Sequence, residues 1–365
     1  MTSVRPVGAN DTLLWGMSSE ERLRRIARAQ KLEFGAKDAE LLANLGYVFD
    51  PGWLRFVAEE PDRVITLGGV PVLAHCTRGE DRAAVAEAME RGQPLAGTGL
   101  SVTAWEESEG LTNSELRKRE RPFMDRLVPE TVRSLERTSY FGAYKGVTDI
   151  LTKYLWPEWA LVLTRWSARA GITPNQVTAV GALLCVAATF LFYYGWYWTG
   201  LAVGLGFMVL DTVDGKLARC TITSSKWGNV FDHGIDLVHP PFWWYAWGVG
   251  LGAYGRPLSD EVFWQVMAVL IGGYVVQRLI EGIFMRKYGM HIHVWRPFDS
   301  WFRLITARRN PNMVILFGFL IVGRPDWGLV AVAAWTVISL LVHAVQLVQA
   351  LMRSASGKPI VSWLS

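Results

Sequence analysis

The order of hydrophobic and polar positions divides this chain of 365 residues into two unlike parts. Up to about Lys153, short apolar runs alternate with charged runs, as they do in soluble domains. Beyond it, long apolar stretches rich in Trp, Phe and Tyr follow one another, and such surfaces need lipid as their solvent. A helix needs about 20 apolar residues to cross a bilayer core. We expect six membrane helices, at 174–194, 196–218, 228–252, 258–284, 312–322 and 327–352. The fifth of them, 312–322, is short.

The segment ahead of the first stretch has a character of its own. Positions 155–170 mix Trp and Leu with Arg165 and Arg169, which is typical of an amphipathic helix lying on a membrane surface. A peripheral helix of the soluble part would show the same pattern. We expect a linker and juxtamembrane helix at 141–172, an all-α membrane domain of six helices at 173–353, and a tail at 354–365.

The first 140 residues carry the signals of a small soluble α/β domain. The runs 45–49, 64–67 and 70–75 are short, apolar and β-branched, and Gly, Pro and Asp bound them. The N-terminus lacks the charged and apolar regions of a secretory signal, so we expect no cleaved signal peptide. The fold class is therefore two-part, with an α/β domain at 1–140 followed by the helical membrane domain.

Basic residues in the loops predict the orientation of the membrane part. On one side of the membrane, the loops between the stretches carry only Arg256 and Arg324. The opposite side carries Lys216, Arg219, Lys226, Arg286, Lys287, Arg296, Arg303, Arg308, Arg309, Arg353 and Lys358. With an even number of crossings, both termini lie in the cytoplasm, and we expect the protein in the inner (cytoplasmic) membrane.

Four carboxylates stand where the second stretch ends and the third begins. Asp211 and Asp214 are three residues apart, and Asp232 and Asp236 are four apart, so each pair lies on one helix face. The two helices are antiparallel neighbours, and all four carboxylates therefore lie near the cytoplasmic edge. Carboxylates this close need a counter-charge, and Mg²⁺ or Mn²⁺ suits a site built from oxygen ligands.

Intramembrane acids also occur in ion and proton pathways, so a coupled transporter is the alternative function. Gly215, Ala218 and Gly228 favour an enzyme instead, because small residues beside the carboxylates leave room for a bulky group such as a nucleotide. Release of a nucleotide, or movement of charge without one, would separate the two functions.

The stretch from Asp211 to Asp236 resembles a known signature. It reads D-x2-D-G-x2-A-R-x8-G-x3-D-x3-D, with every fixed position and spacing of the CDP-alcohol phosphotransferase family present. The resemblance extends over roughly 154–352 and includes the Thr173-Pro174-Asn175 opening of the first stretch.

This resemblance implies an integral membrane enzyme that moves a phospho-alcohol group from a CDP-linked donor to a hydroxyl acceptor and releases CMP. It implies two divalent ions on Asp211, Asp214 and Asp232, with Asp236 as a ligand of the second ion and as the base for the acceptor hydroxyl. The nucleotide-binding positions that it implies are Asn175, Asp214, Gly215, Ala218, Arg219 and Gly228. It also implies a homodimer in contact with membrane lipid, and we expect no nucleic-acid partner.

The acceptor is less well defined by the sequence. Arg278, Arg308 and Arg309 are candidates for binding an acceptor phosphate, as basic residues of this region do in relatives that take inositol phosphate. The positive-inside bias would place arginines here without a ligand, and Glu281 could simply pair with Arg278. A lipid donor with a polyol acceptor, and a CDP-polyol donor with a lipid acceptor, both remain open. His291 and His293 are not expected to bind zinc, because no third ligand is evident.

The N-terminal domain resembles, more weakly, the nucleotidyltransferase-like domain fused to some members of this family. The stretch that carries this resemblance runs from Trp15 to Arg25, and a linking segment resembles the joint of the fused relatives. The Gly-rich phosphate loop of such a domain is absent from the sequence. We therefore expect a degenerate, non-catalytic domain with a binding, docking or structural role.

Overall fold

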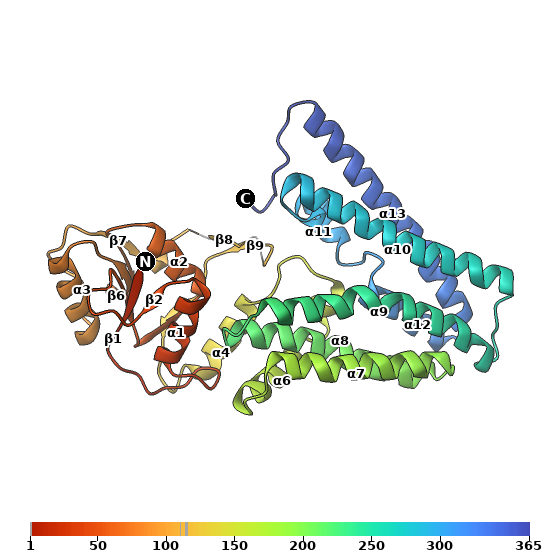
Figure 1. Cartoon of the computed structure of the whole chain (residues 1–365), viewed down its shortest axis with the longest axis horizontal. Helices are drawn as coiled ribbons and strands as arrows, with labels where there is room; N and C mark the ends of the chain where they lie inside the picture. Colours follow the sequence, from red (N-terminus) through yellow and green to blue (C-terminus); the bar gives the residue numbers. More distant parts are fainter. Residues whose placement is uncertain (1, 110, 114–115) are drawn as a thin grey trace.

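The computed structural model shows an α/β domain at one end of the molecule and a set of long helices at the other (Figure 1). The structure describes residues 2–109, 111–113 and 116–365. Within these ranges it describes the backbone alone at Leu111, Thr112, Lys226, Asn229, Asp232 and His233.

The N-terminal domain is built on a mixed sheet with the strand order β2-β1-β3-β6-β5-β7. Strand β1 is parallel to β2 and β3, β6 is antiparallel to β3 and β5, and β7 is parallel to β5. The strands are β1 (Ser3–Val7), β2 (Glu33–Phe34), β3 (Leu41–Asn44), β5 (Arg63–Leu67), β6 (Val70–His75) and β7 (Ser101–Ala104). Smaller pairs join β4 (Tyr47–Phe49) to β10 (Met124–Arg126) and β8 (Leu111–Asn113) to β9 (Lys118–Glu120). The expectation of a small α/β domain is confirmed.

Helices cover both faces of this sheet, because its strands send successive side chains to opposite sides. On one face, Val4, Leu41 and Ile65 share a core with α1 (Ser19–Ala29) and α2 (Pro51–Glu59). On the other face, Val7, Leu42 and Val64 pack with α3 (Gly79–Arg91). The short helix η1 (Trp105–Glu107) follows β7.

Three helices connect this domain to the long ones. They are α4 (Val132–Gly142), α5 (Ile150–Tyr154) and α6 (Pro157–Arg169). The predicted boundary at residue 140 falls inside α4. Helix α6 occupies the predicted amphipathic segment, with Ala160 and Leu161 buried and Trp159, Val162 and Trp166 exposed on its other side.

Within the described residues, each of the predicted membrane stretches contains one long helix. The helices are α7 (Pro174–Tyr193), α8 (Tyr197–Cys220), α9 (Lys226–Ala253), α10 (Asp260–Tyr288), α12 (Arg309–Ile321) and α13 (Pro325–Ala355). Two short helices, η2 (Ile292–Val294) and α11 (Pro297–Phe302), lie between α10 and α12. In Figure 1 helices α6 to α9 run side by side, and α10 runs along α13.

In the described part of the chain, α7, α10 and α13 are long and apolar enough to cross a membrane. Helices α8 and α9 carry the aspartates, which lower their mean hydropathy. Helix α12 has 13 residues and at 1.5 Å per residue extends about 20 Å, short of a bilayer core of about 30 Å. The chain is therefore an integral membrane protein by its apolar helices α7, α10 and α13.

Close backbone contacts fix α9 against α7. A Cβ atom on Gly250 would lie 1.9 Å from the carbonyl oxygen of Phe192, at the end of α7. The aromatic residues Phe192, Trp243 and Trp247 are buried in the same region, and the indole of Trp243 donates to the carbonyl of Cys185. Trp243 therefore packs in the protein interior.

Candidate active site

The two halves of the aspartate signature lie on antiparallel neighbours, as their spacing predicts. Asp211 and Asp214 lie in the last turns of α8, and Asp236 lies in the first turns of α9. The hydroxyl of Ser225 accepts from the amide of Gly228 and so begins α9 directly after a short loop. The side chain of Asp232 lies outside the described residues.

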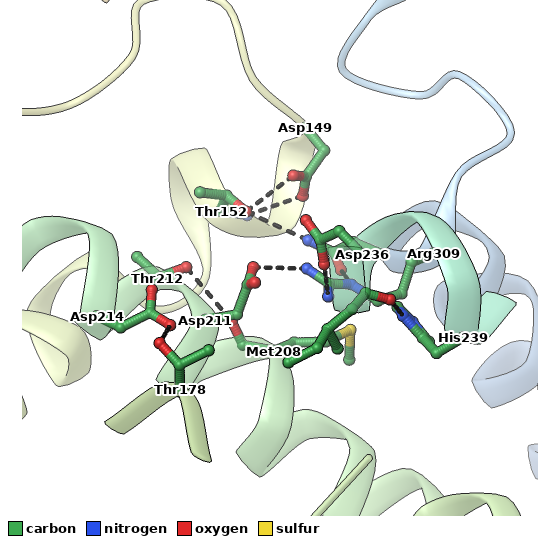
Figure 2. A network of polar contacts seen from close by, with 12 residues as sticks. Asp149, Thr152, Thr178, Met208, Asp211, Thr212, Asp214, Asp236, His239 and Arg309 are labelled. Carbon is green, nitrogen blue, oxygen red and sulfur yellow. Dashed lines mark hydrogen bonds and ion pairs between the residues drawn. The ribbon is translucent and has the colours of Figure 1, made fainter. Parts of the chain in front are cut away.

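Arg309, the first residue of α12, joins the two halves (Figure 2). Its Nη2 atom donates to Asp211 Oδ2 at 2.6 Å, and its Nη1 atom donates to Asp236 Oδ1 at 2.5 Å. A guanidinium presents its donors as a rigid fork, so one side chain holds carboxylates from two helices at once. Asp211 and Asp236 thus converge on one cation, and Arg309 comes from the region where the sequence placed acceptor-binding arginines.

Asp214 faces α7 instead. The hydroxyl of Thr178 donates to Asp214 Oδ2 at 2.6 Å in a buried position, and Figure 2 shows this pair on the far side of Asp211 from Arg309. Thr178 also bonds back to the carbonyl of Pro174, one turn earlier in α7. The carboxylate of Asp214 is therefore oriented by the helix that opens with Thr173.

Two of the predicted nucleotide-binding glycines lie under polar side chains. The Nη2 atom of Arg219 would be 3.2 Å from a Cβ on Gly215, and Oδ1 of Asn175 would be 2.9 Å from a Cβ on Gly228. The Nε atom of Arg219 donates to the carbonyl of Ala143, which ends α4. Glycine at both positions therefore lets Arg219 and Asn175 lie against the helix backbones.

A cavity of about 440 Å³ opens beside this cluster. Asp211, Gly215, Arg219 and Asp236 line one part of it. Ala218, Asn175 and Gly228, also predicted to bind nucleotide, are not among its lining residues. Another part of the lining is cationic and comprises Glu281 together with Arg117, Arg278, His291, His293, Arg303, Arg308 and Arg309.

Glu281 is the centre of this second, cationic part. Arg278 donates to it at 2.8 Å and Arg308 at 2.6 Å, so the expected pairing of Arg278 with Glu281 is confirmed. The arginines nevertheless outnumber their acceptors. Among the described residues, the buried donors without a hydrogen-bond partner include Arg117 Nε, Arg278 Nε, Arg303 Nε, Arg303 Nη1 and Arg308 Nε.

Electrostatics in this part of the cavity favour a bound anion. Burial, and then the neighbouring Arg308, lower the pKa of Arg117 to about 10. Burial and Arg308 also lower the pKa of Arg303 well below its ordinary value. Both guanidiniums lie near Arg308 as well as near the carboxylate of Glu281, and an anion would further stabilise their charged forms.

Asp149 is a carboxylate near the cluster that sequence reasoning missed. Its Oδ1 atom accepts from the amide of Thr152 and so caps α5. Burial opposes its charged form, yet Arg303 and the Thr152 bonds leave its pKa below the ordinary value. The side chain of Asn310, at the start of α12, donates to the hydroxyl of Thr152 and ties α5 to the Arg309 region.

Arg117 and Thr178 were missed as well. The helix-cap pattern before residue 150 could have indicated Asp149. Arg117 and Thr178 give no such signal, because their partners lie on segments distant in the sequence. Arg303 belongs to the cluster of arginines in which the sequence indicated phosphate recognition.

Glu281 and His343 lie beside His293, although the sequence showed no further metal ligand for this histidine. One ligand atom each from Glu281, His293 and His343 lie within 4.8 Å of one another. However, Glu281 already pairs with Arg278 and Arg308, and two guanidiniums beside it would repel a metal dication. The cluster is therefore an ionic network, and Glu281 and His293 of this network line the cavity.

Comparison with known proteins agrees with the signature. Residues 171–337 match the CDP-alcohol phosphatidyltransferase family. Cholinephosphotransferase 1 of Danio rerio is 30% identical over 138 residues, which cover 34% of each chain. Archaetidylinositol phosphate synthase of Pyrococcus horikoshii is 36% identical over 111 residues, which cover 30% of this chain and 54% of that one. Phosphatidylinositol phosphate synthase of Cutibacterium acnes is 33% identical over 101 residues, covering 27% of this chain and 47% of the relative.

The similarity to the CDP-alcohol phosphatidyltransferase family thus covers residues 171–337 of the chain. The chain spans between a third and about half the length of these three relatives. The matched region holds the whole aspartate signature together with Arg278, Arg308 and Arg309. This match supports the transferase interpretation and lends no support to the transporter alternative.

Proposed function

We propose that this protein is a membrane transferase of phospholipid synthesis. It moves a phospho-alcohol group from a CDP-linked donor to a hydroxyl acceptor and releases CMP. The observation that carries this proposal is the convergence of Asp211 and Asp236, from the two halves of the family signature, on one cation beside an open cavity. A cavity with acids at one end and arginines at the other suits two phosphorylated reactants.

The carboxylates fit divalent metal ions. Asp211 and Asp236 offer oxygen ligands from two helices, and a guanidinium already supplies positive charge between them. Hard ions such as Mg²⁺ or Mn²⁺ prefer such ligands. Asp211, Asp214, Asp232 and Asp236 would hold two of them. When bound, these ions stabilise the entering and leaving oxygens of an in-line displacement at phosphorus.

The chain's own residues then bind the reactants and move a proton. Gly215, Ala218, Arg219, Gly228 and Asn175, with Asp214, form the nucleotide site. An Oδ atom of Asp236, whose side chain is 45% exposed toward solvent, takes the proton of the acceptor hydroxyl. Arg309 leaves one or both carboxylates when the reactants bind and contacts a substrate phosphate.

The acceptor that the cavity favours is a phosphorylated polyol. Four arginines each carry at least one buried hydrogen-bond donor without a partner: Arg117, Arg278, Arg303 and Arg308. A phosphate monoester would accept hydrogen bonds from these donors. Two of the relatives make inositol-phosphate lipids by name, whereas others are cholinephosphotransferases. The arginines support a reaction like that of the first group.

A lipid-linked donor completes this reaction. An open apolar groove of about 680 Å³ runs between α7 and α9, beside the signature. Residues that line it include Ala182, Val186, Phe190, Val230, Phe231 and Val238. This groove supports a donor whose acyl chains lie in the bilayer while its CDP group reaches the aspartates.

The proposed architecture follows from the same reasoning. We propose six membrane crossings at 173–353, an amphipathic surface helix within the 141–172 linker, and a homodimer. The termini, the 354–365 tail and the cavity lie on the cytoplasmic side of the inner membrane. The domain at 1–140 is cytoplasmic and non-catalytic.

The reaction is tested by measuring CMP release from purified protein. A panel would pair CDP-diacylglycerol with inositol, inositol phosphate and glycerol phosphate, and CDP-polyols with diacylglycerol, each with Mg²⁺ or Mn²⁺. We expect release with a phosphorylated polyol, and a loss of about 100-fold or more in Asp232→Asn and Asp236→Asn. Asp260→Asn, at the distant start of α10, is the matched control and should keep full activity. No CMP from any pair, together with ion flux in vesicles, would refute the proposal.

A further inference from the structure

Helix α1 of the N-terminal domain contacts the end of α8, the helix that carries Asp211 and Asp214. Arg22 is only 4% exposed, and its Nη1 atom donates to the carbonyl of Cys220 at 3.1 Å. Its Nη2 atom donates to the carbonyl of Phe49 at 3.4 Å, within the N-terminal domain. One turn further on, Arg25 Nη1 donates to the carbonyl of Thr221 at 2.9 Å.

These contacts satisfy a helix end. The last carbonyls of a helix have no amide partner within the helix, and cations near that end are favourable. Cys220 is the last residue of α8 and Thr221 caps it. Burial lowers the pKa of Arg22, so its place there costs free energy that its bonds to Cys220 and Phe49 must offset. Arg22 thus ties the end of α8 directly to the sheet domain.

The next residue of the loop is held as well. Ile222 has a φ of +54°, a left-handed conformation that is rare for a β-branched residue. Its side chain packs against the core that contains Leu23, Ile26 and Phe49. Strain of this kind persists only where the surroundings hold it. The loop that joins the two halves of the signature is therefore fixed partly by the N-terminal domain.

We propose that Arg22 and Arg25 are positioning residues for the metal ligands of the proposed transferase. They fix the loop from Thr221 to Ser225, and this loop sets how the start of α9 lies against the end of α8. The mutual placement of Asp211 and Asp214 with Asp232 and Asp236 then depends on a domain that contributes none of the four aspartates. This inference rests on the proposed function, because it assigns the loop a role in that reaction.

The contact coincides with the segment 15–25, which resembles part of a fused nucleotidyltransferase-like domain. A second contact of the same segment serves as an internal control. The indole Nε1 of Trp15 donates to Ser139 Oγ of α4 at 2.9 Å, in a buried position away from the loop. Losing that bond weakens the docking of the domain without touching the α8 carbonyls.

The test compares Arg22→Met, Arg22→Lys, Arg25→Met and Ser139→Ala in the purified full-length protein. Three quantities are measured: the Kd for Mn²⁺ alone by calorimetry, the melting temperature, and the kcat and KM of CMP release. We expect Arg22→Met to weaken Mn²⁺ binding by about 10-fold or more, as loss of groups that orient metal ligands does. Its kcat should fall in parallel, while the KM for the acceptor stays nearly unchanged. Arg22→Lys, which can reach one carbonyl, should recover part of both losses.

The other variants keep the test decisive. Arg25→Met removes only the Thr221 bond of a partly exposed arginine and should shift the Mn²⁺ affinity in the same direction by less. Ser139→Ala should lower the melting temperature and leave the Mn²⁺ affinity and kcat at wild-type values. The inference is wrong if the two arginine variants behave as Ser139→Ala does. If Arg22→Met does not fold, the Arg22→Lys and Arg25→Met results decide by the same criterion.

Failure of the proposed function gives a different result. In that case wild-type protein releases no CMP from any donor, whereas the Mn²⁺ affinities still report whether Arg22 positions the carboxylates. Unchanged Mn²⁺ binding in the arginine variants, with CMP release intact in wild type, overturns the positioning role alone.

Discussion

At the residue scale, the site depends on how the charge of Asp211 and Asp236 is balanced. In this structure the guanidinium of Arg309 lies between them, with a side chain that is 11% exposed. Divalent ions held by the same carboxylates, as proposed above, would replace at least part of this pairing. Arg309 would then be both a stabilising partner of the two aspartates and a competitor of the ions for their carboxylates.

Arg309→Gln separates these two roles. Without metal, the variant should be less stable than wild type by about 1.5–3 kcal/mol, the cost of losing hydrogen bonds to charged groups. Mg²⁺ or Mn²⁺ should then raise its melting temperature more than that of wild type, because no ion pair has to be broken. Thermal unfolding of both proteins in EDTA and in excess metal measures this difference.

The control for this variant is Arg324→Gln, which breaks an Arg–Asp pair with Asp326 at the start of α13. It should respond to metal as wild type does. Equal metal-induced shifts in Arg309→Gln and wild type would show that Arg309 does not compete for the carboxylates.

Single residues were predictable from the sequence where the helix period alone places them. Asp211 and Asp236 were expected to meet because they lie on two antiparallel helices joined by a short loop, and the structure brings them together. The bond from Thr178 to Asp214 was not foreseen, since it depends on how α7 packs against α8. Arg117 reaches the cavity from a strand-rich segment 174 residues before His291, its hydrogen-bond partner. Tertiary contacts of this kind leave no pattern in one sequence.

At the scale of elements, the position of α9 decides where Asp236 lies. Its far half touches α7 without intervening side chains, because Gly250 faces the carbonyl of Phe192. Gly195, with a φ of +74°, makes the reciprocal approach to Gly250 from the turn after α7. Glycine is required at these places by the closeness of two backbones.

Two glycines on one helix therefore give opposite predictions. Gly250→Ala inserts a methyl group against backbone and should destabilise the protein by about 1–3 kcal/mol, as overpacking does. Gly252→Ala meets nothing within 4 Å and should be neutral or stabilising by about 1 kcal/mol, since alanine favours helix. Melting temperatures in one detergent compare the two variants. Equal effects would mean that α7 and α9 do not touch at Gly250.

Helices were easier to predict than their surroundings. The apolar stretches placed α7, α10 and α13 closely, because lipid-compatible helices need long uninterrupted runs. The span of α12 was expected from 312 and begins at Arg309, since its first turn is polar and buried against the site. The register of the N-terminal sheet could not be read from its short strands, although their existence could.

At the scale of the whole molecule, the cavity is lined by residues from the N-terminal part, from the joint and from the long helices. The N-terminal part contributes Arg117, the joint contributes Asp149, and the helices contribute Asp211, Asp236 and Arg309. Arg22 and Cys220 are 198 residues apart in the chain, so no local pattern announced the contact between the two parts. The weak resemblance of segment 15–25 left a binding, a docking and a structural role open, and it indicated no partner segment.

The orientation of this arrangement in the membrane can be tested by cysteine labelling. Cys76, Cys185 and Cys220 are buried, so wild-type protein should react little with a membrane-impermeant maleimide. Six crossings place Thr223, in the α8–α9 loop, and Ser356, after α13, on the cytoplasmic side, with Arg256 on the other side. Thr223→Cys and Ser356→Cys should therefore be labelled in inside-out vesicles, and Arg256→Cys in right-side-out vesicles. Labelling of Arg256→Cys and Ser356→Cys from the same side would refute the three proposed crossings by α10, α12 and α13, since an odd number of crossings places those two positions on opposite sides of the membrane.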